Sequence, residues 1–376
     1  MSPRRSSDQP LSVGLDATPM LGQRTGIGHT VGALVDALRR RDALSLSAYA
    51  VTWTGRDRLA DLLPEGVTPA TRPVPARLVR RMWRRFDHPR IERWTGPLDV
   101  VHATNFVAPP TRGATVVTVH DLTCVHLPEL CTPDTLEYPA LIRRALDRGA
   151  TVHVVSDTVG AEVRAAFSLP SERVVRIYPG LMPLPPGDAT SGRRIAGCDR
   201  YVLALGTLEP RKNLDALVRA FDVAAAGDRA LGLVIAGPEG WGTDRVHAAI
   251  GAARSSDRIT VLGYVEERAR ADLLAGATLF AYPSRYEGFG HPPLEAMRAG
   301  VPVVAARAGA LPEVLGDAAL LVDPADEAEL AAAITRAVND PTTGAELATR
   351  GRARCQQYTW SQTAAELDRL YHRIAT

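Results

Sequence analysis

The sequence is poor in several features that would place a protein in other functional classes. It has four cysteines, no two of them spaced as C-x-x-C, so neither a zinc site nor a dithiol redox motif is predicted and we expect reduced thiols. No apolar run reaches the roughly 18 residues of a membrane-spanning helix. Gly14 and Asp16 interrupt the first apolar segment, so we expect no signal peptide. These absences favour a cytoplasmic protein.

Lysine is the scarcest charged residue. Among 44 lysine and arginine residues, Lys212 alone is a lysine. Because an ammonium is a compact point charge that a guanidinium does not replace sterically, this residue suggests a specific role, with chance retention as the alternative. The net charge is only +2, with 42 acidic residues, so the strong basic excess of nucleic-acid-binding proteins is missing and we expect no nucleic acid partner.

The chain of 376 residues is long enough for two domains. Short strand-like segments alternate with helical periodicity in two successive series, which predicts an α/β fold with parallel sheets. Residues 179–200 are rich in proline and glycine and lack periodicity. We therefore predict an N-terminal domain at 1–185, a linker at 186–200, a C-terminal domain at 201–358, and a final segment at 359–376 whose helix is capped by Ser361.

The strongest motif lies between residues 282 and 297. Glu287 and Glu295 are separated by seven residues, and Gly288, Phe289 and Gly290 stand between them, before a helix that starts at a proline pair. Glycine lets the backbone approach a ligand closely, and the free N–H groups of a helix start attract an anion. The two carboxylates would accept hydrogen bonds from hydroxyl groups on either side of that anion. The alternative is an ordinary strand-to-helix turn with two solvated glutamates.

With this motif the sequence resembles the retaining glycosyltransferases of family 4, which have the GT-B fold. The resemblance spans nearly the whole chain and is strongest over residues 202–324. It implies two Rossmann-like, doubly wound α/β domains that face each other across a cleft, the first on the acceptor side and the second binding the donor. It also implies a last helix that crosses back to the first domain. Glu287 would lie near the donor sugar, and Glu295 would bind the ribose.

A second matching segment is Gly206-Thr-Leu-Glu-Pro-Arg-Lys-Asn213, which follows a predicted strand and opens a helix. The resemblance implies that Lys212 and an arginine neutralise the donor diphosphate, where negative charge grows as the glycosidic bond breaks. Many relatives have an arginine where this chain has Thr207. We therefore assign the second charge to Arg211, whose alternative is a solvated side chain at a helix start, and we assign Gly206 and Thr207 to donor binding.

Three further strand ends match the family. Gly263 and Tyr264 follow a strand, and the resemblance implies that their turn holds the nucleotide base, with Tyr264 either stacked on the base or packed on the protein. His120 also ends a strand and, by the same resemblance, faces the donor sugar in the catalytic site; otherwise it is structural. Asp121 either orients the His120 ring or caps the next segment. Ser156 matches a serine of many relatives, although we favour a role as an N-cap.

The N-terminal half holds two weaker signals. The glycine-rich loop at 22–28 contains Gly26 and Gly28, which the resemblance makes candidates for donor binding, and Arg24, which adds charge. It lacks the G-x-G-x-x-G dinucleotide fingerprint, and a plain flexible turn is the alternative. Residues 77–94 mix arginines with apolar side chains. This stretch either contacts an anionic membrane surface, at the inner face of the membrane, or packs its apolar side on the core.

The expected activity is transfer of a hexose from a nucleotide diphosphate sugar to a hydroxyl group of a glycan, glycolipid or small molecule. Family membership implies retention of anomeric configuration and no metal or other cofactor. The Thr-Gly-Ile-Gly sequence at 25–28 resembles envelope mannosyltransferases, which favours GDP-mannose over UDP-glucose and UDP-N-acetylglucosamine. The alternatives are a nucleotide-sugar epimerase of the same fold, a non-catalytic nucleotide-sugar-binding protein and a phosphorylase-like enzyme. No general base and no metal ligand are predicted.

Overall fold

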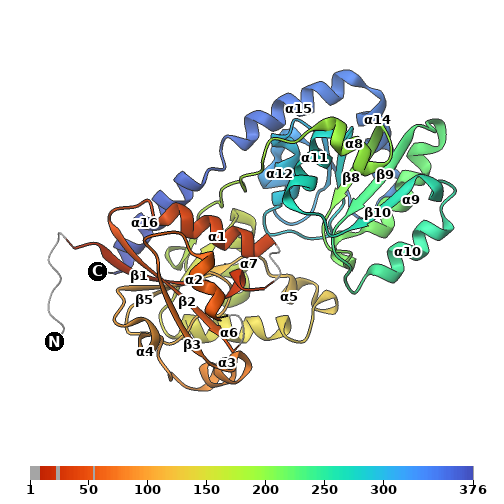
Figure 1. Ribbon diagram of the computed structural model, residues 1–376. Helices are drawn as coiled ribbons and strands as arrows, with labels where there is room; N and C mark the ends of the chain where they lie inside the picture. The colour runs from red at the N-terminus through yellow and green to blue at the C-terminus, as the bar shows by residue number, and fades with distance from the viewer. Residues whose placement is uncertain (1–8, 23–25, 54–55, 376) are drawn as a thin grey trace. The chain divides into compact units, whose positions relative to one another are not determined.

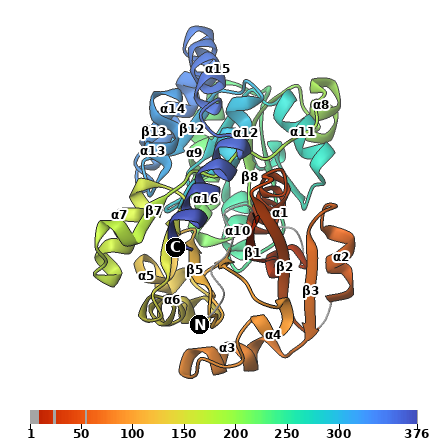
Figure 2. The ribbon, with the colours of Figure 1, turned by 90° about the vertical axis from the view of Figure 1, so that its left-hand side faces the viewer.

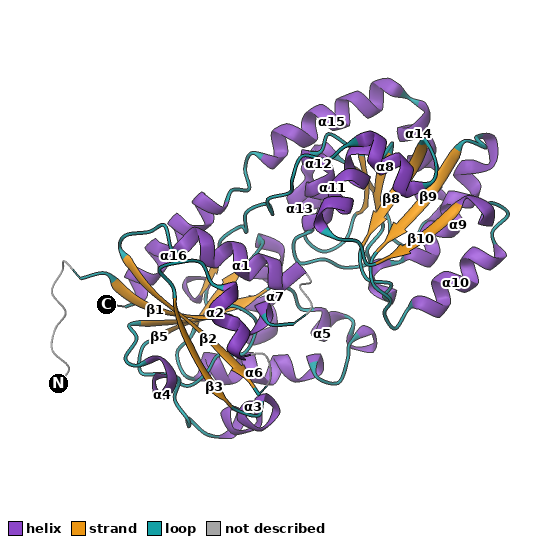
Figure 3. Ribbon diagram, in the orientation of Figure 1, coloured by secondary structure: helices purple, strands orange, loops and turns teal. Residues whose placement is uncertain are grey.

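The computed structural model describes residues 9–22, 26–53 and 56–375. Internal contacts divide the chain into two units: one runs to Gly180 and resumes at Tyr358, and the other is Leu181–Gln357. Figure 3 shows in each unit a layer of strands with helices on both sides. Within the described ranges no helix is both long and apolar enough to cross a bilayer.

The first unit is built on a parallel seven-stranded sheet in the order β3-β2-β1-β4-β5-β6-β7 (Figure 1). Its strands are short and rich in buried β-branched residues, as expected where both faces of a sheet are covered. Their bounds are β1 Leu11–Asp16, β2 Leu44–Thr52, β3 Thr68–Pro73, β4 Val100–Ala103, β5 Ala114–Val119, β6 Thr151–Val154 and β7 Val174–Arg176.

The helices of the first unit cover both faces of this sheet. They are α1 Gly26–Leu38, α2 Leu59–Leu62, α3 Ala76–Arg85, α4 Glu92–Thr95, α5 Thr123–His126, α6 Tyr138–Asp147, α7 Asp157–Phe167 and α16 Trp360–Ile374. The last helix, α16, lies beside α1 although more than 300 residues separate them in sequence (Figures 1 and 2). Its buried Leu367, Leu370 and Tyr371 belong to the same core as Val13 and Leu15 of β1.

A buried hydrogen-bond chain ties α16 to the middle of that sheet. The hydroxyl of Tyr371 is hydrogen-bonded to Nδ1 of His102, whose Nε2 lies 2.6 Å from Oγ1 of Thr118. Thr118 is in turn 2.8 Å from Nδ1 of His153, whose Nε2 donates to the carbonyl of Ile177 at 3.0 Å. The chain therefore joins α16, β4, β5 and β6. Burial lowers the pKa of both histidines, that of His153 to about 4, so both rings are neutral.

The second unit has a parallel six-stranded sheet in the order β10-β9-β8-β11-β12-β13. The strands are β8 Arg200–Leu205, β9 Leu231–Ala236, β10 Ile259–Gly263, β11 Leu279–Tyr282, β12 Val303–Ala306 and β13 Leu320–Val322. The helices are α8 Ala189–Ala196, α9 Leu214–Ala224, α10 Thr243–Ala252, α11 Glu267–Gly276, α12 His291–Arg298, α13 Leu311–Leu315, α14 Glu327–Asn339 and α15 Pro341–Cys355. As in the first unit, side chains that end parallel strands meet at one edge of the sheet.

Two sequence predictions differ from the structure. The segment predicted as a linker at 186–200 contains α8, which packs on α11 and is capped by Asp188, whose carboxylate accepts from the backbone N–H of Ser191 at 2.7 Å. Asp188 was overlooked because proline and glycine dominate its surroundings. The cap of α16 is Thr359, whose hydroxyl accepts from the backbone N–H of Gln362 at 3.3 Å, so the prediction of Ser361 was wrong by two residues.

Candidate functional site

Lys212 and Arg211 lie in a tight turn at the carboxyl end of β8. After β8, Gly206 has φ +150° and Thr207 continues the turn, and Pro210–Lys212 then form one 3₁₀ turn before α9. L side chains rarely adopt this φ, so the turn favours glycine at 206, where the Lys212 stem packs at van der Waals distance. The turn therefore folds Lys212 back over the strand end.

Lys212 meets Glu287, which follows β11, the neighbour of β8 in the sheet. Its ammonium lies 2.6 Å from Oε1 of Glu287 and donates to the hydroxyl of Tyr282 at 2.7 Å. The same carboxylate oxygen accepts from Oγ of Ser284 at 2.6 Å and from Tyr282 at 3.0 Å. An ammonium carries three N–H donors, and the residues that the structure describes engage two of them, which leaves one for a ligand.

Arg211 joins the same cluster from the other side. Its guanidinium lies 2.8 Å from Oε1 of Glu287 and donates to the backbone carbonyl of Tyr286 at 2.8 Å. It also bonds Oε1 of Glu209 at 2.6 Å. The alternative of a solvated side chain is therefore excluded for Arg211, which is largely buried and paired. Two cations and two carboxylates form a neutral cluster at the carboxyl edge of the sheet.

The electrostatics of this cluster favour its charged form. Burial alone would raise the pKa of Glu287, but Arg211 and Lys212 hold it at about 2. Burial lowers the pKa of Lys212, and Glu287 opposes that shift. The carboxylate therefore favours the protonated form of the buried lysine and fixes its position.

The loop 288–290 leads from Glu287 into α12. Gly290 has φ +106° at the N-cap of this helix, where a Cβ would approach Leu311 to 2.7 Å, so only glycine fits. Phe289 is buried, with its ring edge-on to His291 at 5.0 Å. Pro292 and Pro293 have no N–H and therefore supply no donors at this helix start.

Glu295, the second glutamate of the motif, has different partners from Glu287. It is 2% exposed, and its Oε2 accepts no hydrogen bond from any described residue, although the guanidinium of Arg270 lies 3.5 Å away as an ion-pair partner. Burial raises the pKa of Glu295 to about 7. It lines a cavity of about 330 Å³ together with Leu184, Arg298 and the 185–187 segment. The carboxylate is therefore buried and under-satisfied, as a hydroxyl-binding group would be.

In the turn after β10, Gly263 is held by a backbone hydrogen bond, whereas Tyr264 is exposed. Gly263 has φ +68°, and its carbonyl accepts from the N–H of Gly237 at 2.8 Å. The Tyr264 ring is 54% exposed. Tyr264 is therefore not packed in the core, which leaves its ring accessible for stacking.

In the first unit, His120 follows the end of β5. Its Nε2 is 2.8 Å from the carbonyl of Thr104, and its ring is edge-on to Phe106 at 5.9 Å. Because a carbonyl only accepts, Nε2 carries the hydrogen and Nδ1 is left as an acceptor. Burial lowers the pKa of His120. Asp121 caps the next turn by accepting from the N–H of Thr123 at 2.9 Å.

Two of the remaining candidates of the first unit, Ser156 and Gly28, have local structural roles. Ser156 caps α7 by accepting from the N–H of Val159 at 3.1 Å, which confirms that prediction. Gly26 and Gly28 lie in the first turn of α1, and a Cβ on Gly28 would approach the carbonyl of Pro19 to 2.7 Å. Gly28 therefore allows close packing of α1. Arg24 lies outside the described residues.

Sequence reasoning missed Glu209, Tyr282 and Ser284, which complete the Lys212 cluster. Tyr282 ends β11 and Ser284 follows it, so their position at a carboxyl strand end was the available signal. A sequence alone does not say which side of the strand end a side chain faces.

Family models match both units. One described as Glycosyltransferase Family 4 covers residues 24–182, and one described as Glycosyl transferases group 1 covers residues 192–354. The O-antigen chain mannosyltransferase B of Escherichia coli is 32% identical over 76% of this chain and 77% of its own length. The D-inositol 3-phosphate glycosyltransferase of Rhodococcus opacus is 34% identical over 51% of this chain and 45% of its own length.

Among solved structures, Anabaena HepE in complex with UDP and glucose resembles this chain with a TM-score of 0.72. The two are 20% identical, and the match covers 95% of this chain and 99% of HepE. At 20% identity, the structural similarity is evidence for a shared fold only.

Proposed function

The chain belongs to family 4 of the glycosyltransferases and has their GT-B fold, and on that premise we propose that it is a retaining mannosyltransferase using GDP-mannose. Its acceptor is a hydroxyl group of a glycan, glycolipid or small molecule. The mannosyl assignment is supported by the O-antigen mannosyltransferase, 32% identical to it. UDP-sugars are the second choice, since HepE was solved with UDP and glucose. The epimerase alternative receives no support from these relatives.

The Lys212 cluster is the observation that carries the proposal. When the bond between sugar and diphosphate breaks, negative charge grows on the leaving phosphate, and a preorganised cation stabilises it. Lys212 is held by Glu287 at 2.6 Å with one N–H to spare, and Arg211 stands beside it. We propose that these two cations take the part that a metal ion plays in other transferases, so the reaction needs no metal.

For the rest of the donor we propose the assignments that follow from the family. Glu295, with its under-satisfied carboxylate, accepts from the ribose hydroxyls, and the exposed ring of Tyr264 stacks on the base. The N–H groups of 288–290 face the diphosphate, as do Gly206 and Thr207. His120 is a neutral ring whose Nδ1 accepts from a hydroxyl of the donor sugar.

Retention follows if the acceptor hydroxyl attacks from the face that the diphosphate leaves. The departing phosphate oxygen then takes the proton of that hydroxyl, so neither a protein nucleophile nor a protein base is required. The buried, paired state of Glu287 agrees with this role assignment, because a carboxylate whose pKa is held near 2 by two cations is a weak base.

We also propose that α3 contacts an anionic membrane surface from the cytoplasmic side. Val79 and Trp83 of α3 are buried, so part of its apolar side packs on the core. Leu78 is 55% exposed and Phe86 is 60% exposed, among exposed arginines. Sedimentation with vesicles of anionic or neutral lipid tests this proposal. Binding to anionic vesicles that the Arg81→Glu/Arg85→Glu variant loses is the expected result, and equal binding to both lipids contradicts it.

A donor screen by thermal shift tests the proposed function. The protein is heated with GDP, UDP, ADP and their sugars, with and without EDTA, and the same is done for Lys212→Ala and for Arg245→Ala, an exposed-arginine control in the same unit. We expect GDP compounds to raise the Tm of the wild type and of the control, EDTA to have no effect, and Lys212→Ala to lose the shift. Absence of any nucleotide shift in the wild type would overturn the proposal in favour of a different ligand.

A further inference from the structure

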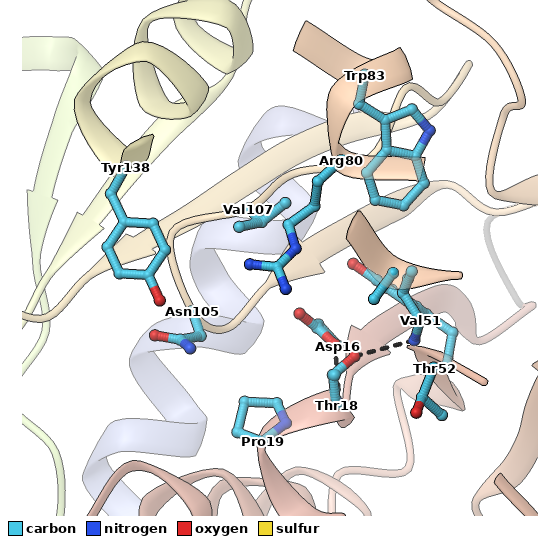
Figure 4. A pocket seen from close by; sticks show the side chains of 12 residues that line it. Asp16, Thr18, Pro19, Val51, Thr52, Arg80, Trp83, Asn105, Val107 and Tyr138 are labelled. Atoms are coloured by element: carbon cyan, nitrogen blue, oxygen red, sulfur yellow. Dashed lines mark hydrogen bonds between the residues drawn. The ribbon is translucent and has the colours of Figure 1, made fainter. Parts of the chain in front are cut away.

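The first unit has its own cavity at the carboxyl edge of its sheet, separate from every residue assigned above. Its volume is about 330 Å³. Five of the polar side chains that line it come from separate places in the chain: Asp16 from β1, Tyr49 from β2, Arg80 from α3, Asn105 after β4, and Tyr138 from α6. Figure 4 shows the guanidinium of Arg80 pointing toward the carboxyl group of Asp16, with Asn105 and Tyr138 opposite.

Within the described part of the chain, two buried polar atoms of the lining residues have no hydrogen-bond partner. The hydroxyl of Tyr49, on a side chain only 1% exposed, makes no hydrogen bond, and neither does the buried Oδ1 of Asn105. A buried polar group left unsatisfied costs about 1–3 kcal/mol, and such groups are rare in native proteins. Both residues line the cavity, so the cavity wall includes buried polar groups that the protein leaves unsatisfied.

The charges of the cavity indicate what kind of molecule that is. The carboxyl group of Asp16 accepts from the N–H of Thr18 at 2.9 Å, and the positive charge of Arg80 in the same wall favours its ionised form against the effect of burial. Donors and acceptors are therefore mixed without a net positive charge. A phosphate group would meet the Asp16 carboxylate and be repelled, whereas adjacent hydroxyl groups can accept from Arg80 and donate to Asp16.

The remaining wall suits a sugar ring. Val51, Trp83 and Val107 line the cavity with apolar surface. Trp83 uses its indole N–H on the carbonyl of Pro89 at 2.9 Å, so toward the cavity it can offer only its carbon face. The C–H face of a pyranose packs on such a surface. The volume is at the low end of the range of about 300–1,000 Å³ for small-molecule sites, which fits one or two sugar rings.

The cavity shares its framework with His120. The hydroxyl of Thr104 donates to the backbone carbonyl of Asp16 at 2.6 Å, and the carbonyl of Thr104 accepts from His120 at 2.8 Å. Phe106 stacks on Tyr138 with ring centres 4.5 Å apart and meets His120 edge-on. A molecule in the cavity is thus bound within the layer of side chains that positions His120.

We propose that this cavity binds the acceptor as an uncharged hexose residue, and that Asp16, with Arg80 beside it in the cavity wall, discriminates against phosphorylated acceptors. This inference rests on the proposed transferase function. It narrows the acceptor from any hydroxyl compound to a neutral glycan end and makes Asp16 a specificity-determining residue.

Saturation-transfer NMR without donor tests the proposal. The probes are methyl α-mannoside and α-1,3-mannobiose as neutral acceptors, and mannose 6-phosphate and inositol 3-phosphate as charged ones. The wild type should bind the neutral probes at least about tenfold more tightly than the charged ones. Asp16→Asn keeps the shape and the acceptor oxygen for Thr18, so it should reduce this preference to less than about threefold. Asp42→Asn, an exposed site in the same unit, should leave the preference unchanged.

Equal or tighter binding of the phosphorylated probes by the wild type would overturn the proposal, as would an unchanged preference in a folded Asp16→Asn. If Asp16→Asn fails to fold, the wild-type preference alone decides. The nucleotide-induced Tm shift distinguishes failure of the acceptor-site proposal from failure of the proposed transferase function. A wild type that keeps this shift but binds no neutral sugar refutes the acceptor site alone, and one that lacks the shift refutes the transferase function.

Discussion

Oε1 of Glu287 lies 2.6 Å from the ammonium of Lys212, and the same atom also meets Arg211, Tyr282 and Ser284. A single carboxylate oxygen therefore organises both cations that we assign to the diphosphate. The arrangement keeps them protonated and fixed before any donor arrives, so little reorganisation is required when the leaving group becomes charged.

Removing the negative charge of Glu287 should lower the stability of the folded protein and make that stability depend on bound nucleotide. Glu287→Gln keeps the shape but leaves two buried cations with too little negative charge, which costs about 3–5 kcal/mol. Because a diphosphate supplies the missing charge, GDP should raise the free energy of unfolding of this variant more than that of the wild type. Urea unfolding with and without GDP measures both effects.

The control for this experiment is Glu327→Gln, which breaks an exposed ion pair with Arg219 in the same unit. Exposed pairs contribute about 0–1 kcal/mol, so its unfolding should be nearly that of the wild type. If Glu287→Gln behaves like Glu327→Gln, Glu287 does not hold the cations as described.

Donor binding should strengthen as the pH rises through the pKa of Glu295. Burial raises this pKa to about 7 in the free protein, and a carboxylate that accepts ribose hydroxyls must be ionised. From about pH 6 to about pH 8 the ionised fraction, and with it the affinity for GDP-mannose, should rise about tenfold. Calorimetric titration measures it, with GDP-mannose rather than GDP because its diphosphate does not titrate in this range. Glu295→Gln should show no such rise, and a rise in the variant would assign the effect to another group.

The histidine chain under α16 should make the first unit sensitive to acid. The pKa of His153 falls from 6.5 in the unfolded chain to about 4 in the folded one because it is buried. The stability that neutral His153 contributes is therefore fully present above about pH 6.5 and is lost as the pH falls through about 4. The loss in free energy of unfolding is about 3 kcal/mol. Urea unfolding at several pH values should show this loss in the wild type and in His247→Gln, an exposed control, and a smaller one in His153→Gln.

The cap of α16 offers a direct test of where this helix begins. Thr359→Ala removes the hydroxyl that accepts from Gln362, which should cost about 1 kcal/mol of stability. Ser361→Ala lies inside the first turn and should change stability by less than about 0.5 kcal/mol. Chemical denaturation of the two variants compares them. The reverse order would support a helix start at Ser361.

Much of the fold could be predicted because its central strands are buried apolar runs. The predicted strands at 11–16 and 231–236 coincide with β1 and β9. The strands β2 and β3 were not predicted, since β2 contains two serines and β3 is an edge strand with two prolines and exposed side chains. Local pattern does not reveal pairing with a neighbour, and pairing is what makes these segments strands.

Site residues could be predicted where they belong to one sequence motif. Contacts between residues of distant segments could not. Lys212 and Glu287 were each marked by their own motif, but their contact across 75 residues follows only from adjacent strand ends. The cavity around Asp16 had no sequence signal, because its polar groups come from five separate elements. Such a site becomes visible once the parallel sheet brings those elements to one edge.

Acceptor-dependent turnover of GDP-mannose tests the central claim most directly. The full chain is incubated with GDP-mannose and α-1,3-mannobiose in EDTA, and GDP release and the product are followed by mass spectrometry and NMR. The account predicts GDP release that requires the acceptor, a trisaccharide with a new α-linked mannose, and a loss of about 10²–10³ in kcat for Lys212→Ala. Release of GDP without acceptor, a β-linked product, or full activity in Lys212→Ala would contradict it.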